Sequence, residues 1–99
     1  MRYVNEVTIQ GSVGSCAEST VDRERTLRLA VFTETPQGNP VWHVADVPAR
    51  LMGGGTPATH DGVRISGYIR QEITPAAPGM FRRNDVIEAL SFERINDND

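Results

Sequence analysis

Lysine is absent from the sequence and cysteine occurs once, at Cys16. A single cysteine excludes an internal disulfide and a cysteine cluster for a structural metal. Long hydrophobic runs are also missing, since no stretch approaches the roughly 20 apolar residues of a membrane-spanning helix. Arg2, Asn5 and Glu6 interrupt the apolar residues near the start, so we expect no secretory signal. These absences predict a cytoplasmic protein with no membrane partner.

All ten basic residues are therefore arginine. A guanidinium group can bind phosphate oxygens with two parallel hydrogen bonds and can stack on a base, which an ammonium group cannot. The formal net charge of -3 opposes nucleic-acid binding, because non-specific affinity comes mostly from neutralising phosphates. The placement of the arginines must then matter more than their total.

The chain has 99 residues, which is enough for one hydrophobic core and too few for two. We expect one domain over residues 1–95, followed by a short acidic polar tail at 96–99. The hydrophobic fraction of 38% is lean for so short a chain, and this favours self-association.

Apolar residues recur at every second position in several segments, as in Val7, Ile9, Gly11 and Val13. This period predicts β-strands. The predicted strands cover residues 4–13, 26–35, 41–47, 62–73 and 85–95. Polar or proline-rich segments predict loops at 14–25, 36–40 and 74–83. Pro48 to Met52 predicts a short helical turn, which Gly53 to Gly55 would end.

Five short strands with a helical turn between the third and fourth match one all-β architecture. It is the five-stranded Greek-key barrel of the OB-fold. Another small β-barrel or a β-sandwich is the alternative.

Several segments resemble a known family in order and spacing. Residues 5–11 (NEVTIQG) resemble the first strand of bacterial single-stranded-DNA-binding proteins, residues 27–30 (LRLA) the second and residues 42–44 (WHV) the third. Residues 63–70 (VRISGYIR) have the form of the fourth. Family members are typically longer and end in a tip that recruits partner proteins. We expect no such tip here, because this sequence ends at Asn96 to Asp99.

The chain length, the short turn at 36–40, residues 47–51 (VPARL) and the ending IEALSFERI are more similar to the primosomal replication protein N family. The lysine-rich loop of that family is replaced here by Arg82 and Arg83. The resemblance implies a non-enzymatic protein of DNA replication or replication restart, without a cofactor. It implies single-stranded DNA, or RNA, as ligand, a homodimer or homotetramer, and replication or restart proteins as partners.

OB-fold surfaces bind single strands through aromatic side chains that stack on bases and basic side chains along the backbone. The candidate stacking residues are Trp42, Phe32, Tyr68 and Phe81. The candidate phosphate-binding residues are Arg28, Arg64, Arg70, Arg82 and Arg83. For the aromatic residues the structural alternative is packing on a half-buried strand, and for the arginines it is a solvated barrel exterior.

Enzyme motifs are not supported. Gly53 to Gly55 lacks the Lys-Ser/Thr that follows a phosphate-binding loop, and residues 11–15 lack the setting of a nucleophile elbow. His43 and His60 have no ligand cluster nearby, so we expect no metal site. Cys16 is expected to be an ordinary thiol. The alternative function is a protein-interaction module that self-associates or docks a partner without nucleic acid. An oligosaccharide-binding OB domain is a third reading.

Overall fold

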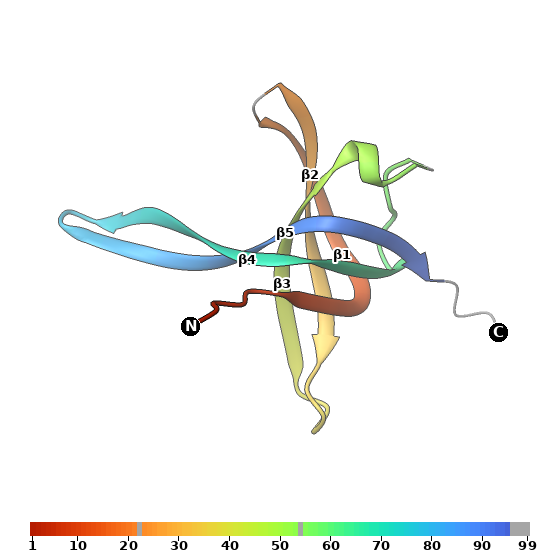
Figure 1. Ribbon diagram of the computed structural model, residues 1–99, viewed down its shortest axis with the longest axis horizontal. Helices are drawn as coiled ribbons and strands as arrows, with labels where there is room; N and C mark the ends of the chain where they lie inside the picture. Colours follow the sequence, from red (N-terminus) through yellow and green to blue (C-terminus); the bar gives the residue numbers. More distant parts are fainter. Residues whose placement is uncertain (22, 54, 96–99) are drawn as a thin grey trace.

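The computed structural model describes residues 1–21, 23–53 and 55–95. Their strands are β1 (Val7–Val21), β2 (Glu24–Glu34), β3 (Pro40–Pro48), β4 (Gly62–Ala77) and β5 (Met80–Ile95), with a 3-10 turn, η1 (Ala49–Leu51), before β4. The strands form a closed barrel in the order β1-β2-β3-β5-β4 (Figure 1). The predicted all-β class and helical turn are confirmed. The predicted tail at 96–99 lies outside the described residues.

The core follows the predicted alternation. Leu27, Leu29 and Val31 of β2 point inward, and between them lie Arg28 and Ala30 on the outer face. The buried core cluster consists of Ile9, Val13, Leu27, Leu29, Val31, Ala45, Val47, Met52, Val63, Ile65, Ile87 and Ala89. Burying each large aliphatic side chain contributes about 1.5 to 3 kcal/mol. The opposite faces of the strands are left available for function.

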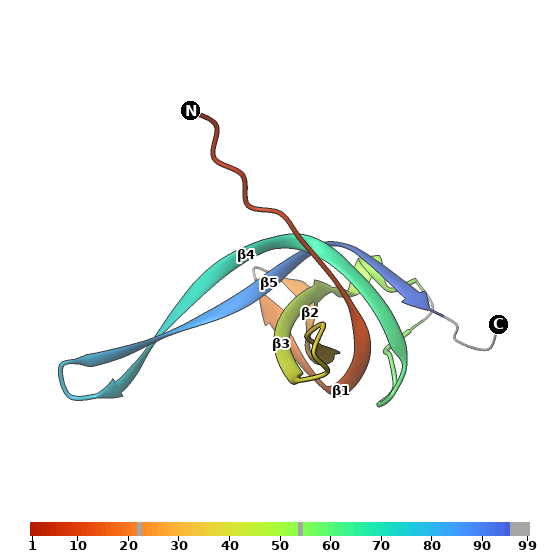
Figure 2. The ribbon, with the colours of Figure 1, turned by 90° about the horizontal axis from the view of Figure 1, so that it is seen from below.

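Two glycines let backbones approach where the barrel bends. β1 pairs with β4 up to Ser12 and with β2 from Ser12 onward, so it turns a corner at Gly11 (Figure 2). A Cβ added at Gly11 would lie 1.9 Å from the carbonyl oxygen of Phe32. At Gly67, beside a β-bulge in β4, an added Cβ would lie 1.8 Å from the carbonyl oxygen of Glu88. Only glycine fits at either position.

The predicted loop at residues 14–25 is wrong. β1 continues to Val21 and pairs with β2 in a long hairpin, in which Cys16 lies opposite Leu29. The polar composition misled the prediction, because strand pairing uses backbone groups that polar residues also carry. An ion pair across the hairpin joins Arg25 Nε to Glu18 Oε1 at 2.6 Å. The predicted loop residue Asp22 lies outside the described residues.

The predicted loop at residues 74–83 is also wrong. β4 extends to Ala77 and β5 starts at Met80, so the turn is short and contains Gly79 with a φ of 76°. Pro75 is accommodated next to a bulge between Pro75 and Ala77. The resulting β4–β5 hairpin projects well beyond the barrel (Figures 1 and 2). It carries the candidate residues Phe81, Arg82 and Arg83 on a two-stranded arm.

The turn predicted at residues 36–40 is confirmed. Gly38 has a φ of 85°, and its amide donates a hydrogen bond of 2.8 Å to the carbonyl oxygen of Thr35. This turn joins β2 to β3 in a hairpin. Within the described ranges, no helix is long and apolar enough to cross a membrane.

Candidate nucleic-acid interface

Trp42 is an exposed aromatic side chain on the outer face of β3. It lies opposite Phe32 of β2, and 60% of its surface is exposed. The two rings meet edge to face, with centroids 5.5 Å apart and an interplanar angle of 63°. A Cβ added at Gly14 would lie 2.4 Å from Trp42 Cζ3, so the indole lies against the β1 backbone at that glycine. Phe32 and Gly14 therefore support Trp42 and leave much of its ring open to solvent.

Trp42 also borders a cleft between β3, the start of β1 and the base of the β4–β5 hairpin. The cleft has a volume of about 310 Å³. We call it the Trp42 cleft, and its lining residues are Val7, Trp42, His43, Val44, Ile69, Asp85 and Ile87. An indole beside aliphatic side chains suits a planar, largely apolar group such as a nucleobase. Asp85 is the charged lining residue, and it disfavours an anion at the floor of the cleft.

The register of the β4–β5 hairpin sorts its side chains onto two faces. Ile73 lies opposite Arg83 and Pro75 opposite Phe81, in the same alternating series as the cleft residues Ile69 and Asp85. We call this the cleft face. Thr74 and Arg82 lie opposite each other on the other face, in series with Arg70 and Glu72. Phe81, 70% exposed, and Arg83 thus share a face with the Trp42 cleft. Neither Arg82 nor Arg83 forms an ion pair with any residue that the structure describes.

Arg28 and Arg70 meet at one buried carboxylate. The Asp46 side chain is only 6% exposed. Arg28 binds it with two parallel hydrogen bonds, 2.7 Å from Nε to Oδ1 and 2.9 Å from Nη2 to Oδ2. Arg70 Nη2 donates to Asp46 Oδ2 from the other side. Arg28 and Arg70, two of the predicted phosphate-binding residues, thus lie together, but their side chains are paired with acids.

Two more carboxylates complete this cluster. Glu72 accepts hydrogen bonds from both arginines, at 3.3 Å from Arg28 Nη1 and 3.2 Å from Arg70 Nη1. Glu88 accepts from Arg70 Nε at 2.6 Å. We call these five residues, Arg28, Asp46, Arg70, Glu72 and Glu88, the Asp46 network. Two positive charges face three negative ones.

Comparisons with known proteins were made by sequence and by structure. No family model matches the sequence, and no curated protein matches it. The N-terminal domain of PriB from Thermoanaerobacter tencongensis, described as dimeric, has a TM-score of 0.76 at 16% identity, covering 94% of this chain and 98% of that one. Plasmodium falciparum SSB in complex with ssDNA has a TM-score of 0.74 at 11% identity, covering 97% and 98%. The mitochondrial single-stranded DNA binding protein Rim1 of S. cerevisiae has a TM-score of 0.67 at 13% identity, covering 96% of this chain and 97% of that one.

The chain has the OB fold. In OB folds, ligands bind on the face of strands 2 and 3 and on the loops that join strands 1 to 2 and strands 4 to 5. Here that face carries Phe32 and Trp42 near the β2–β3 turn. Arg28 and Asp46 lie further along it. The OB ligand face is thus divided into an aromatic half and a half occupied by the Asp46 network.

The network perturbs the ionisation of its members. Burial alone would raise the pKa of Asp46, but hydrogen bonds from Arg28 and the charges of both arginines hold this pKa below its usual range. Hydrogen bonds from Arg28 are the main reason that the pKa of Glu72 is also lowered. The pKa of Arg28 is raised by its hydrogen bonds to Asp46 and Glu72. Arg28, Asp46 and Glu72 are therefore charged at neutral pH.

Asp46→Asn is expected to lower the free energy of unfolding at pH 7 by about 1.5 to 3 kcal/mol, because charge-assisted hydrogen bonds to a buried group are lost. The pKa of Asp46 is lower in the folded protein than in the unfolded chain, where it is about 3.9. Asp46 therefore stabilises the fold at pH values above about 3.9, and this stabilisation is lost as the pH falls through the pKa of the folded state. Denaturant unfolding at pH 7 and pH 3 should therefore show a difference between wild type and variant that shrinks at pH 3. Glu93→Gln, in an exposed ion pair with Arg64, is the control and should change stability by less than about 1 kcal/mol. A pH-independent difference would contradict this account.

The remaining candidate residues are more dispersed. Tyr68 is partly exposed and lines a depression with the network residues Asp46, Arg70 and Glu88. Arg64 lies near the start of β4, away from the hairpin. Its Nη2 donates to Gln10 Oε1 at 2.9 Å and its Nη1 to Glu93 Oε2 at 3.2 Å. The structure therefore does not bring Arg64 together with the other predicted arginines.

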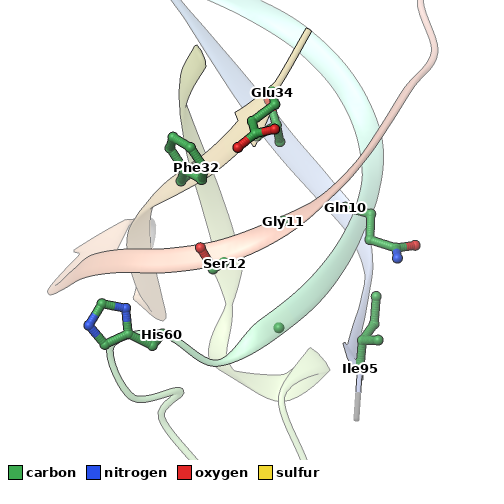
Figure 3. Close-up of a pocket in the computed structure, with 9 residues that line it drawn as sticks. Gln10, Gly11, Ser12, Phe32, Glu34, His60 and Ile95 are labelled. Carbon is green, nitrogen blue, oxygen red and sulfur yellow. The ribbon is translucent and has the colours of Figure 1, made fainter. Parts of the chain in front are cut away.

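A depression of about 370 Å³ lies beside the corner of β1. Figure 3 shows Phe32 and Glu34 reaching its rim from β2, Gln10 from β1 and His60 from the segment before β4. Its lining is mainly polar, and the carboxylate of Glu34 has no arginine side chain beside it in this lining. No group of three or more metal-ligating side chains occurs among residues 1–21, 23–53 and 55–95.

His43 and Cys16 both contact other parts of the barrel. His43 Nε2 lies 2.9 Å from Thr33 Oγ1 and is half-buried. Partial burial raises the pKa of the Cys16 thiol, which packs against the core. A raised pKa lowers the nucleophilicity of a cysteine at neutral pH because the thiolate is the reactive form.

The acids of the Asp46 network were not found by sequence reasoning. Asp46 lies on the same face of β3 as Trp42, but its ion pairs were not expected. One signal was present: a lone carboxylate between the buried residues Ala45 and Val47 needs a cationic partner if its own side chain is covered. Glu72 and Glu88 gave no comparable signal.

Proposed function

We propose that this chain is a non-enzymatic protein that binds single-stranded DNA on the aromatic half of its OB face. The observation that carries the proposal is Trp42, which is supported by Phe32 and Gly14 and yet is 60% exposed on that face. Covering an exposed indole with the face of a base removes apolar surface from water, which favours binding. Stacking a base on an aromatic side chain contributes about 1 to 3 kcal/mol.

We assign the sugar-phosphate backbone of the bound DNA to the cleft face of the β4–β5 hairpin. Phe81 offers a second stacking surface there, and Arg83 offers a positive charge without an ion-pair partner in the described residues. The Trp42 cleft lies at the base of the same face. A strand that runs from Trp42 along the hairpin would alternate base stacking with phosphate contact.

The similar structures support this proposal in general terms. One was solved in complex with ssDNA and another is described as a single-stranded DNA binding protein. The PriB domain is described as dimeric, and with the lean core this supports a homodimer as the functional unit. A role in DNA replication or replication restart, in the cytoplasm, completes the proposal.

Titration of the tryptophan fluorescence with a 30-nucleotide poly(dT), chosen to be long enough for about two OB sites, tests the function directly. Trp42 is the only tryptophan, so stacking on it should quench the signal. The quenching should weaken as salt is raised. No quenching and no change in oligonucleotide anisotropy at low salt would refute single-strand binding. The same titration with poly(rU) measures the preference between DNA and RNA.

Arg83→Ala is expected to weaken poly(dT) binding and to reduce the slope of log K against log salt by about 0.7, the loss of one phosphate contact. Arg82→Ala is the matched control, because it removes the same charge one residue away on the opposite hairpin face. We expect Arg82→Ala to change the slope less. Equal effects of the two variants would show that the hairpin acts through its overall charge and would contradict the assignment to one face.

A protein-interaction module is the second candidate, and the hairpin supplies the observation that favours it. Ile73, Met80 and Phe81 are all more than half exposed near its tip. Apolar side chains on a projecting arm also suit a protein partner. Binding of the partner should then be insensitive to salt and to the arginine substitutions. Poly(dT) should not compete with the partner.

A further inference from the structure

The Asp46 network occupies half of the OB ligand face with arginines that are already bound. Every guanidinium nitrogen of Arg28 and Arg70 donates to a carboxylate within the network. Two guanidinium groups against three carboxylates give a formal charge of -1. A phosphate that approached this half of the face would meet net negative charge.

The arginines are nevertheless reachable from solvent. The Arg28 side chain is 41% exposed and that of Arg70 is 36% exposed. Arg28 lies on β2 and Arg70 on β4. Arg70, Glu72 and Glu88 belong to the same alternating series of the β4–β5 pair as Arg82. Position and exposure would let both arginines bind phosphate. What withholds them is their carboxylate partners.

The three carboxylates differ in what they do for the fold. Asp46 is buried, so its pairing is required for stability. Glu72 and Glu88 are 27% and 29% exposed and pair with arginines that Asp46 already binds. Ion pairs at such partly exposed positions contribute little to stability, typically 0 to 1 kcal/mol. Their larger effect is on the charge that the face presents to a ligand.

We propose that Glu72 and Glu88 are specificity-determining residues of the interface, which hold Arg28 and Arg70 away from phosphate. The single strand is thereby confined to the aromatic half and to the cleft face of the hairpin. Replacing either glutamate by its amide frees part of a guanidinium group and extends the phosphate-binding path across the whole face. This inference rests on the proposed binding of single-stranded DNA.

The variants Glu72→Gln and Glu88→Gln test the proposal against Glu93→Gln. Each change removes one negative charge from an ion pair with an arginine, but Glu93 pairs with Arg64 outside the network. In fluorescence and anisotropy titrations with poly(dT) at low salt, we expect Glu72→Gln and Glu88→Gln each to bind about tenfold more tightly than wild type. The slope of log K against log salt should steepen by about 0.7 in each. Glu93→Gln should change affinity by less than about twofold.

A double variant locates the gain. In Glu72→Gln combined with Arg28→Ala, most of the extra affinity should disappear, because Glu72 accepts two hydrogen bonds from Arg28 and one from Arg70. The Nε–Hε signal of Arg28 in a nitrogen-15 NMR spectrum should shift on addition of poly(dT) in Glu72→Gln and stay in place in wild type. Thermal unfolding establishes that each variant is folded. Glu88→Gln, which acts through Arg70, is an independent test if one variant is unstable.

The outcomes separate the two proposals. Suppose that wild type binds poly(dT) and that the affinities of Glu72→Gln and Glu88→Gln equal that of Glu93→Gln. This result would overturn the role of the two glutamates and leave the proposed function standing. Failure of wild type and of every variant to bind would overturn the proposed function, and the inference with it.

Discussion

Gly67→Ala is expected to destabilise the barrel strongly. The added Cβ would lie 1.8 Å from the carbonyl oxygen of Glu88 and 2.8 Å from its carbonyl carbon. Both are backbone atoms of the paired strand, so neither can rotate away as a flexible side chain would. Separating β4 from β5 here would break the ladder at the bulge. We expect the free energy of unfolding to fall by at least about 3 kcal/mol, beyond the usual range for one substitution.

Calorimetry or circular dichroism during heating measures this effect. For a domain of this size, a loss of about 3 kcal/mol lowers Tm by roughly 12 to 24 °C. Ser91→Ala is a control at an exposed position of β5 and should stay within about 0.5 kcal/mol of wild type. If Gly67→Ala melted close to wild type, the close approach of β4 and β5 at this bulge would be incorrect.

Trp42→Ala is expected to weaken binding of poly(dT) by roughly 5- to 150-fold, which corresponds to about 1 to 3 kcal/mol for one stacked base. Stability should change much less, because most of the indole is exposed. The variant has no tryptophan, so binding has to be followed by the anisotropy of a labelled oligonucleotide. Trp42→Phe should recover part of the affinity, since it keeps an aromatic face.

Tyr3→Ala is the matched control for Trp42→Ala. Tyr3 is an aromatic residue that is 88% exposed, but it lies in the segment before β1 and outside the OB ligand face. Its removal should leave affinity within about twofold of wild type. Equal losses from Tyr3→Ala and Trp42→Ala would contradict a specific stacking role for Trp42, as would no loss from either.

The barrel was predictable where side chains decide the structure. Leu27, Leu29 and Val31 alternate with the partly buried Arg28 and Ala30, and this period placed β2 with its correct inner face. Gly38 marked the β2–β3 turn. The outer halves of two hairpins were missed because residues such as Ser15, Ser19 and Pro75 favour loops locally, whereas backbone pairing with the neighbouring strand holds them extended.

The site was predictable to a lesser degree. Trp42 was a candidate stacking residue, and the structure leaves it exposed on the outer face of β3. The outward position of Arg28 followed from the same alternation. Its partner Glu72 lies 44 residues further along the chain, and the pair meets only because the β4–β5 hairpin packs beside β3. Such a contact depends on strand order and register, which periodicity does not contain.

The closure of the barrel also has a consequence for how the chain folds. The β1–β2, β2–β3 and β4–β5 pairings are hairpins between neighbouring strands, but Val7 pairs with Gly67 and Ala45 with Ile87. Bringing such distant segments together costs chain entropy before any contact repays it. We therefore expect the hairpins to form first. The two long-range joints, of β1 with β4 and of β3 with β5, are then expected to form late and to limit the rate at which the barrel closes.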